Sequence, residues 1–210
     1  MHIPKGTTAE LELVTFQQAL QAANTPSEEY DIGKWIYAPN FYSEYRYLLG
    51  TRGARPLICI GINPSTAKPD VLDNTLKSVE RIALANGFDS FLMFNVYAQR
   101  ATDPDAMEKV CNLRLHKENL EAFRYALSIS EDPAVWAAWG TILEKRSYLP
   151  ECLRDLVAAG VSYGAKWYCA GAVSKKGHPH HPLYLRKDEI LKPFDVTAYL
   201  AGLGIEEETK

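Results

Sequence analysis

The sequence has no long apolar run and little excess of either charge. Its longest apolar stretches, residues 56–62 and 90–98, are far too short to span a bilayer, so we expect no membrane insertion. Its first residues contain no apolar segment of the kind that directs secretion, so we expect a cytoplasmic protein. The net charge of −3 argues against a general polyanion binder, although it does not exclude a local basic face.

Paired cysteine motifs are also lacking. The four cysteines are Cys59, Cys111, Cys152 and Cys169, and each lies in an apolar or helical pattern. We interpret them as reduced thiols that mostly pack as small hydrophobic residues. The histidine cluster at residues 178–181 has no patterned carboxylate or thiol beside it. The sequence therefore predicts neither a metal site nor a cofactor.

A chain of 210 residues is long enough to bury a core without disulfides or metals. Four runs, at residues 57–62, 91–96, 134–139 and 166–170, have the continuous apolar character of strands buried on both faces. The segments between them are long enough for crossover helices. The sequence therefore predicts an α/β domain over residues 56–203, a three-layer α/β/α sandwich around a central, mainly parallel sheet of four strands.

The two ends of the chain differ from this core. Residues 1–55 offer an amphipathic helix near 9–23, followed by tyrosine-rich runs at 34–38 and 42–49 that predict a hairpin or edge strands. We expect this N-terminal extension to pack on the core. The acidic tail, residues 204–210, is expected to fray.

Polar side chains gather in the loops that follow the four predicted strands. In an open parallel sheet, ligands bind outside the carboxyl ends of the strands, so these loops are the expected location of a site. The candidates, in chain order, are Asn63, Ser65, Asn95, Arg100, Trp139, His178, His180 and His181.

Several candidates also have a purely structural interpretation. Asn63 and Asn95 would then satisfy nearby backbone groups, and Arg100 would pair with Asp103 on the surface. The histidines would belong to a solvated loop. The convergence of all of them on one edge of the sheet favours a ligand site.

Four segments, taken in order, resemble motifs of the uracil-DNA glycosylase superfamily. They are residues 61–64, 92–95, 135–140 and 178–183. The resemblance implies a glycosylase-like fold and hydrolysis of an N-glycosidic bond. It implies that Asn63 positions the attacking water and that Asn95 reads the base. It also implies that a histidine steadies the departing base, and either His178 or His181 fits that role.

The chemistry of these residue types agrees with modest catalysis. A carboxamide orients water but cannot deprotonate it, whereas a histidine donor stabilises negative charge on the leaving base. Ser65 stands where the glycosylases carry a glycine or a tyrosine that screens the pocket. We therefore expect the pocket to admit substituents that the strictest uracil enzymes exclude.

A second and more specific resemblance is to a bacterial and phage family of unknown function, number sixteen forty-three among such domains. The shared segments are residues 63–67, 100–104 and 177–184. This resemblance implies no particular activity.

The expected partners are DNA, RNA or a nucleotide. Contacts to nucleic acid would come from basic residues near the active edge and from apolar wedge residues that assist base flipping. These residues are Lys68, Lys175, Lys176, Leu183, Tyr184 and Arg186. Two alternatives stay open, namely a non-catalytic nucleotide or nucleic-acid binding module and a structural or protein-interaction domain on the same fold.

Overall fold

The computed structural model describes residues 1–204, so the predicted acidic tail lies outside the described residues except for Gly204. One mixed sheet organises the chain, with strand order β1-β2-β4-β3-β5-β6-β7. Its strands are β1 (Trp35–Ala38), β2 (Leu48–Thr51), β3 (Pro56–Gly61), β4 (Ser90–Asn95), β5 (Ala134–Ala137), β6 (Lys166–Ala170) and β7 (Leu191–Pro193).

The centre of the sheet is parallel and its two edges are antiparallel. Strands β4, β3, β5 and β6 run parallel to one another, and Gly61 at the end of β3 lies opposite Asn95 at the end of β4. Strands β1 and β2 continue the sheet beyond β4, and β7 pairs with β6 at the other edge. The predicted α/β class is confirmed, but the sheet is larger than four strands and mixed, because the edge segments join it.

Five α-helices and four short 3-10 helices connect or flank the strands in the described residues. The helices are α1 (Phe16–Ala23), α2 (Asn74–Ala85), α3 (Leu113–Ser128), α4 (Leu149–Ser162) and α5 (Val196–Gly202). The 3-10 helices are η1 (Thr8–Glu10), η2 (Pro104–Ala106), η3 (Gly140–Lys145) and η4 (Pro182–Tyr184). Local capping explains where α2 and α3 start: Asp73 accepts a hydrogen bond from the backbone of Leu76 at 2.9 Å before α2, and Asn112 does the same for Leu115 before α3.

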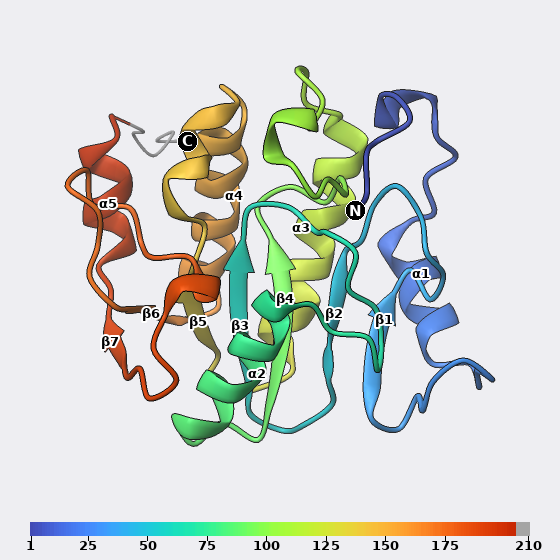
Figure 1. The fold of residues 1–210 in the computed structure, drawn as a ribbon, viewed down its shortest axis with the longest axis horizontal. Coiled ribbons are helices and arrows are strands. Elements are labelled where there is room, and N and C mark those ends of the chain that lie inside the picture. Colours follow the sequence, from blue (N-terminus) through green and yellow to red (C-terminus); the bar gives the residue numbers. More distant parts are fainter. Residues whose placement is uncertain (205–210) are drawn as a thin grey trace.

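Two hydrophobic cores lie on opposite faces of the sheet, because side chains alternate along each strand. In β3, Ile58 and Ile60 pack with α3 and α4, whereas Leu57 and Cys59 pack with α2. Figure 1 shows α2 in front of the central strands, with the N-terminal helix α1 and the C-terminal helix α5 at opposite ends of the molecule. None of the helices within residues 1–204 combines the length and apolar character that crossing a bilayer requires.

Candidate functional site

A cavity of about 780 Å³ opens at the carboxyl ends of the parallel strands. The loops after β3, β5 and β6 contribute to its wall, as do the end of β4 and the first turn of α2. Its size is that of a site for a small organic ligand. Seven predicted site residues line it: Asn63, Ser65, Asn95, His178, His180, His181 and Leu183.

Two hydrogen bonds from its amide nitrogen hold the side chain of Asn63 in place. Its Nδ2 donates to the carbonyl oxygens of Ala101 at 2.6 Å and of Pro64 at 3.2 Å. Within residues 1–204, no group donates a hydrogen bond to its Oδ1. The side chain therefore offers an acceptor to a water molecule or a ligand N–H group.

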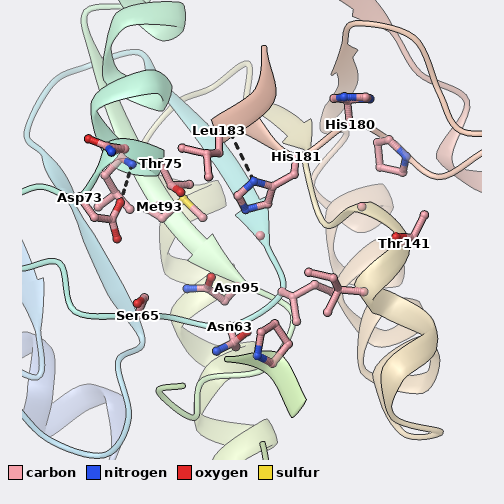
Figure 2. A pocket seen from close by; sticks show the side chains of 18 of the residues that line it. Asn63, Ser65, Asp73, Thr75, Met93, Asn95, Thr141, His180, His181 and Leu183 are labelled. Atoms are coloured by element: carbon pink, nitrogen blue, oxygen red, sulfur yellow. Dashed lines mark hydrogen bonds between the residues drawn. The ribbon is translucent and has the colours of Figure 1, made fainter. Parts of the chain in front are cut away.

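Asn95 is buried and lies directly beside Asn63 (Figure 2). Its amide is satisfied when Nδ2 donates to the backbone carbonyls of Asn63 at 3.2 Å and Phe94 at 3.3 Å. The backbone carbonyl of Asn95 accepts a hydrogen bond from Asn119 Nδ2 at 2.9 Å, which fixes the end of β4. Asn63 and Asn95 thus both use their side-chain nitrogens on backbone carbonyls.

The lack of a side chain at Gly61 leaves space beside Asn95 and Met93. A Cβ atom at position 61 would lie 2.6 Å from Met93 Cε and 3.2 Å from the side-chain amide of Asn95. Only a residue without a side chain leaves the floor of the cavity open here without displacing Met93. Sequence reasoning saw Gly61 only as part of a motif.

His178 is held inside a hydrogen-bonded network. Trp139 Nε1 donates to Tyr199 Oη at 3.0 Å, and that hydroxyl lies 2.7 Å from His178 Nδ1. Burial raises the pKa of Tyr199 to about 12, so the hydroxyl stays protonated and donates a hydrogen bond to His178 Nδ1. His178 Nε2 lies 3.2 Å from Glu144 Oε1. Both ring nitrogens of His178 therefore have hydrogen-bond partners within the protein.

His181 has a different hydrogen-bond partner: its Nδ1 accepts a hydrogen bond from the backbone N–H of Leu183 at 3.3 Å. Burial lowers the pKa of His181, with a smaller contribution of the same sign from His180, against the opposing effect of Asp73. The ring is therefore neutral at pH 7, with its proton on Nε2. Figure 2 shows this imidazole above Asn95 and Asn63. The two histidines that the sequence left as alternatives therefore lie in different hydrogen-bonding surroundings.

Two other predicted residues are buried beside the cavity and do not line it. Trp139 belongs to the hydrophobic core. Arg100 is fully buried, donates to the backbone of Ser65 and to Tyr37 Oη at 3.0 Å, and so holds the loop after β3 from beneath. Sequence reasoning missed Arg46, which lines the cavity from the segment before β2. Its position inside a tyrosine-rich strand pattern gave no signal of a site.

Two of the predicted basic contacts are paired with acids. Lys176 pairs with Glu144 at 2.9 Å, and Arg186 pairs with Asp188 at 3.3 Å. Lys68 and Lys175 are exposed. Of the two proposed wedge residues, Leu183 is exposed at the cavity rim, and Tyr184 lies in η4.

The described residues contain no group of three or more histidine, cysteine or acidic side chains close enough to hold a metal ion. All four cysteines are free thiols. The Sγ atoms of Cys111 and Cys152 lie 3.9 Å apart, well away from the cavity lining.

Comparison with protein families gives a match over residues 46–183 to a family described as "Protein of unknown function (DUF1643)". Every residue that lines the cavity, from Arg46 to Leu183, falls within that range. Comparisons with curated proteins and with solved structures found no match.

Proposed function

The chain belongs to the DUF1643 family, whose function is unknown, and from its site we propose that the cavity binds a nucleobase and that the protein is a glycosylase-like hydrolase. The observation that carries this proposal is the meeting of Asn63, Asn95 and His181 in one cavity. The four sequence segments that resemble uracil-DNA glycosylase motifs support it, since three of them supply these residues.

Each side chain has a distinct task in the proposed reaction. Asn95 Oδ1 accepts an N–H group on the edge of the base, and Asn63 Oδ1 holds the attacking water. The C1′–N bond breaks and its electron pair moves to the base, while the sugar passes through an oxocarbenium-like state. His181, donating from Nε2 as a neutral imidazole, stabilises the charge on the base. The water oxygen then bonds to C1′, and the water proton passes to the base or to solvent.

A second candidate is a non-catalytic module that binds a nucleotide or nucleic acid in the same cavity. The observation that favours it concerns the carboxylates. Within the described residues, Asp73 is the only acid that lines the cavity, and its Oδ1 already accepts from the backbone of Leu76 at 2.9 Å. Among residues 1–204, no second carboxylate lines the cavity to take a proton from the water that Asn63 would hold. A dissociative cleavage tolerates this arrangement, and a binding module does not need such a base.

The test is a screen for released base. Oligonucleotides, nucleosides and nucleotides with normal and modified bases are incubated with wild-type protein, and free base is measured by chromatography. We expect release from at least one substrate, and a loss of about 100-fold in rate for His181→Ala, as for removal of an oxyanion donor. His2→Ala is the control, because His2 lies outside the cavity lining and its ring contacts Glu44 and Tyr42. Ligand binding without release of any base would establish the second candidate instead.

A further inference from the structure

Arg46 is a buried cation without an acidic partner. Its side chain lines the cavity, yet the residue is only 1% exposed. Its Nη1 donates to the Ala67 carbonyl at 3.1 Å. In the part of the chain that the structure describes, its Nε has no hydrogen-bond acceptor, and no carboxylate lies within ion-pair distance.

A second buried cation lies beside it. Arg100 Nη1 also reaches the Ala67 carbonyl, at 3.4 Å, and Arg100 Nε has no acceptor among residues 1–204 either. Burial, reinforced by the nearby charge of Arg100, lowers the pKa of Arg46 to about 9. The two guanidinium groups therefore share one loop with no opposing charge in contact.

The acids that act on this pair from a distance have other partners. Asp73 acts on Arg46 while its Oδ1 caps α2. Glu44 acts on Arg100 while its Oε2 lies 3.1 Å from His2 Nε2. A buried charge without a contacting counterion is costly, and a bound anion would remove that cost.

The surroundings of Arg46 are suited to an anion with several oxygens. Ser65 and Thr66 line the same cavity, and their backbone N–H groups have no acceptor within the described residues. A guanidinium presents a planar fork of donors that matches phosphate oxygens in two parallel hydrogen bonds.

We infer that the ligand of this cavity carries a phosphate group that Arg46 binds, so that the substrate class is a nucleoside monophosphate. The inference rests on the proposed function for the base and adds the charged part of the ligand. A mononucleotide fits better than a polymer, because Lys176 and Arg186 are already paired with acids and Arg100 is buried. The cavity also has the volume of a small-ligand site.

The test compares matched ligands on wild-type protein by titration calorimetry. The probes are nucleosides, their 5′-monophosphates and ribose 5-phosphate. We expect at least one monophosphate to bind about 10-fold or more tightly than its nucleoside, because charge-assisted hydrogen bonds are the strong ones. Arg46→Gln should abolish that difference. The matched control is Arg52→Gln, since Arg52 also bonds backbone carbonyls, at Ile32 and Trp35, but lies outside the cavity.

A second variant guards against a folding defect in Arg46→Gln. Asp73→Asn removes the only carboxylate that lines the cavity within residues 1–204 and keeps a side chain that caps helices well. We expect it to bind the monophosphate several-fold more tightly and the nucleoside with unchanged affinity.

The outcomes distinguish the two proposals. If nucleosides bind as tightly as their monophosphates, or if Asp73→Asn changes neither affinity, the phosphate inference is wrong and the base site stands. If ribose 5-phosphate binds as tightly as every nucleotide, the phosphate site stands and the nucleobase proposal is wrong. If no probe binds at millimolar concentration, the phosphate inference is wrong, and the nucleobase proposal is decided by the oligonucleotides in the base-release screen.

Discussion

The side-chain nitrogen of Asn63 lies 2.6 Å from the carbonyl oxygen of Ala101. This hydrogen bond joins the loop after β3 to the loop after β4, and no group among residues 1–204 donates a hydrogen bond to Asn63 Oδ1. We predict that Asn63→Asp lowers the free energy of unfolding by about 1–3 kcal/mol, because the carboxylate cannot donate to that carbonyl. Urea denaturation measures the change. Asn74→Asp is the control, since it is exposed at the start of α2, and equal stability of the two variants would contradict the assignment.

The two asparagines should differ in their effect on ligand. Asn63→Ala should slow turnover and leave binding of the ligand nearly intact, because it removes the acceptor for water. Asn95→Ala should weaken binding by about 1–3 kcal/mol, because it removes the acceptor for the base edge. A single-turnover assay beside a binding titration separates these effects. If Asn63→Ala loses binding but keeps its rate per bound complex, the roles are assigned wrongly.

Gly61 should control the space available to the ligand. We predict that Gly61→Ala weakens ligand binding by about 10-fold or more, because the new Cβ pushes Met93 toward the cavity. The fold should tolerate the change, since Met93 is a flexible side chain. The double variant Gly61→Ala/Met93→Ala makes room again and should recover much of the affinity. Unchanged affinity in the single variant would show that the ligand does not reach this floor.

Stability should depend on pH through His181. Burial lowers the pKa of His181 in the native state, whereas the unfolded chain has the ordinary value of about 6.5. Its contribution to stability is therefore complete above about pH 6.5 and is lost as the pH falls through the native pKa. As the pH falls below about 6.5, the wild type should therefore lose stability more steeply than His181→Gln. His180→Gln should follow the wild type, and parallel curves for all three would refute the prediction.

Cysteine reactivity should be confined to one thiol. The hydrogen bond between the thiols of Cys111 and Cys152 lowers the pKa of Cys111 and raises the pKa of Cys152. Burial raises the pKa of Cys59 well above its ordinary value. We predict that Cys111 is alkylated first by iodoacetamide, since the thiolate is the reactive form. Peptide mass spectrometry identifies the modified residue. Earlier modification of Cys59 would contradict the structure.

The central strands could be predicted because their apolar runs are continuous, as in residues 57–62, which became β3. Strand β7 was missed, since it has only three residues, mostly exposed, and ends in a proline. The carboxyl ends of parallel strands lie at the same edge of a sheet, and this rule predicted from the sequence alone that Asn63 and Asn95 lie close together. Arg46 could not be found in this way, since it enters the cavity from the antiparallel edge of the sheet.

The sequence could not distinguish the surroundings of His178 from those of His181, because the contact that differs comes from another part of the chain. His178 differs from His181 because Tyr199, far along the chain in α5, occupies its Nδ1. No local pattern around residue 178 indicates that partner. Arg100 similarly resembles a surface residue in the sequence, yet the loop carbonyls and Tyr37 bury it.

The central claim is that the cavity holds a nucleobase against Asn95 and His181. A crystal structure of the wild-type protein with its tightest-binding nucleoside monophosphate tests this claim most directly. We predict that the base lies with an N–H group within hydrogen-bond distance of Asn95 Oδ1 and an oxygen facing His181, with the phosphate at Arg46. A nucleotide bound on another face, or one whose base points into solvent away from both side chains, would contradict the claim.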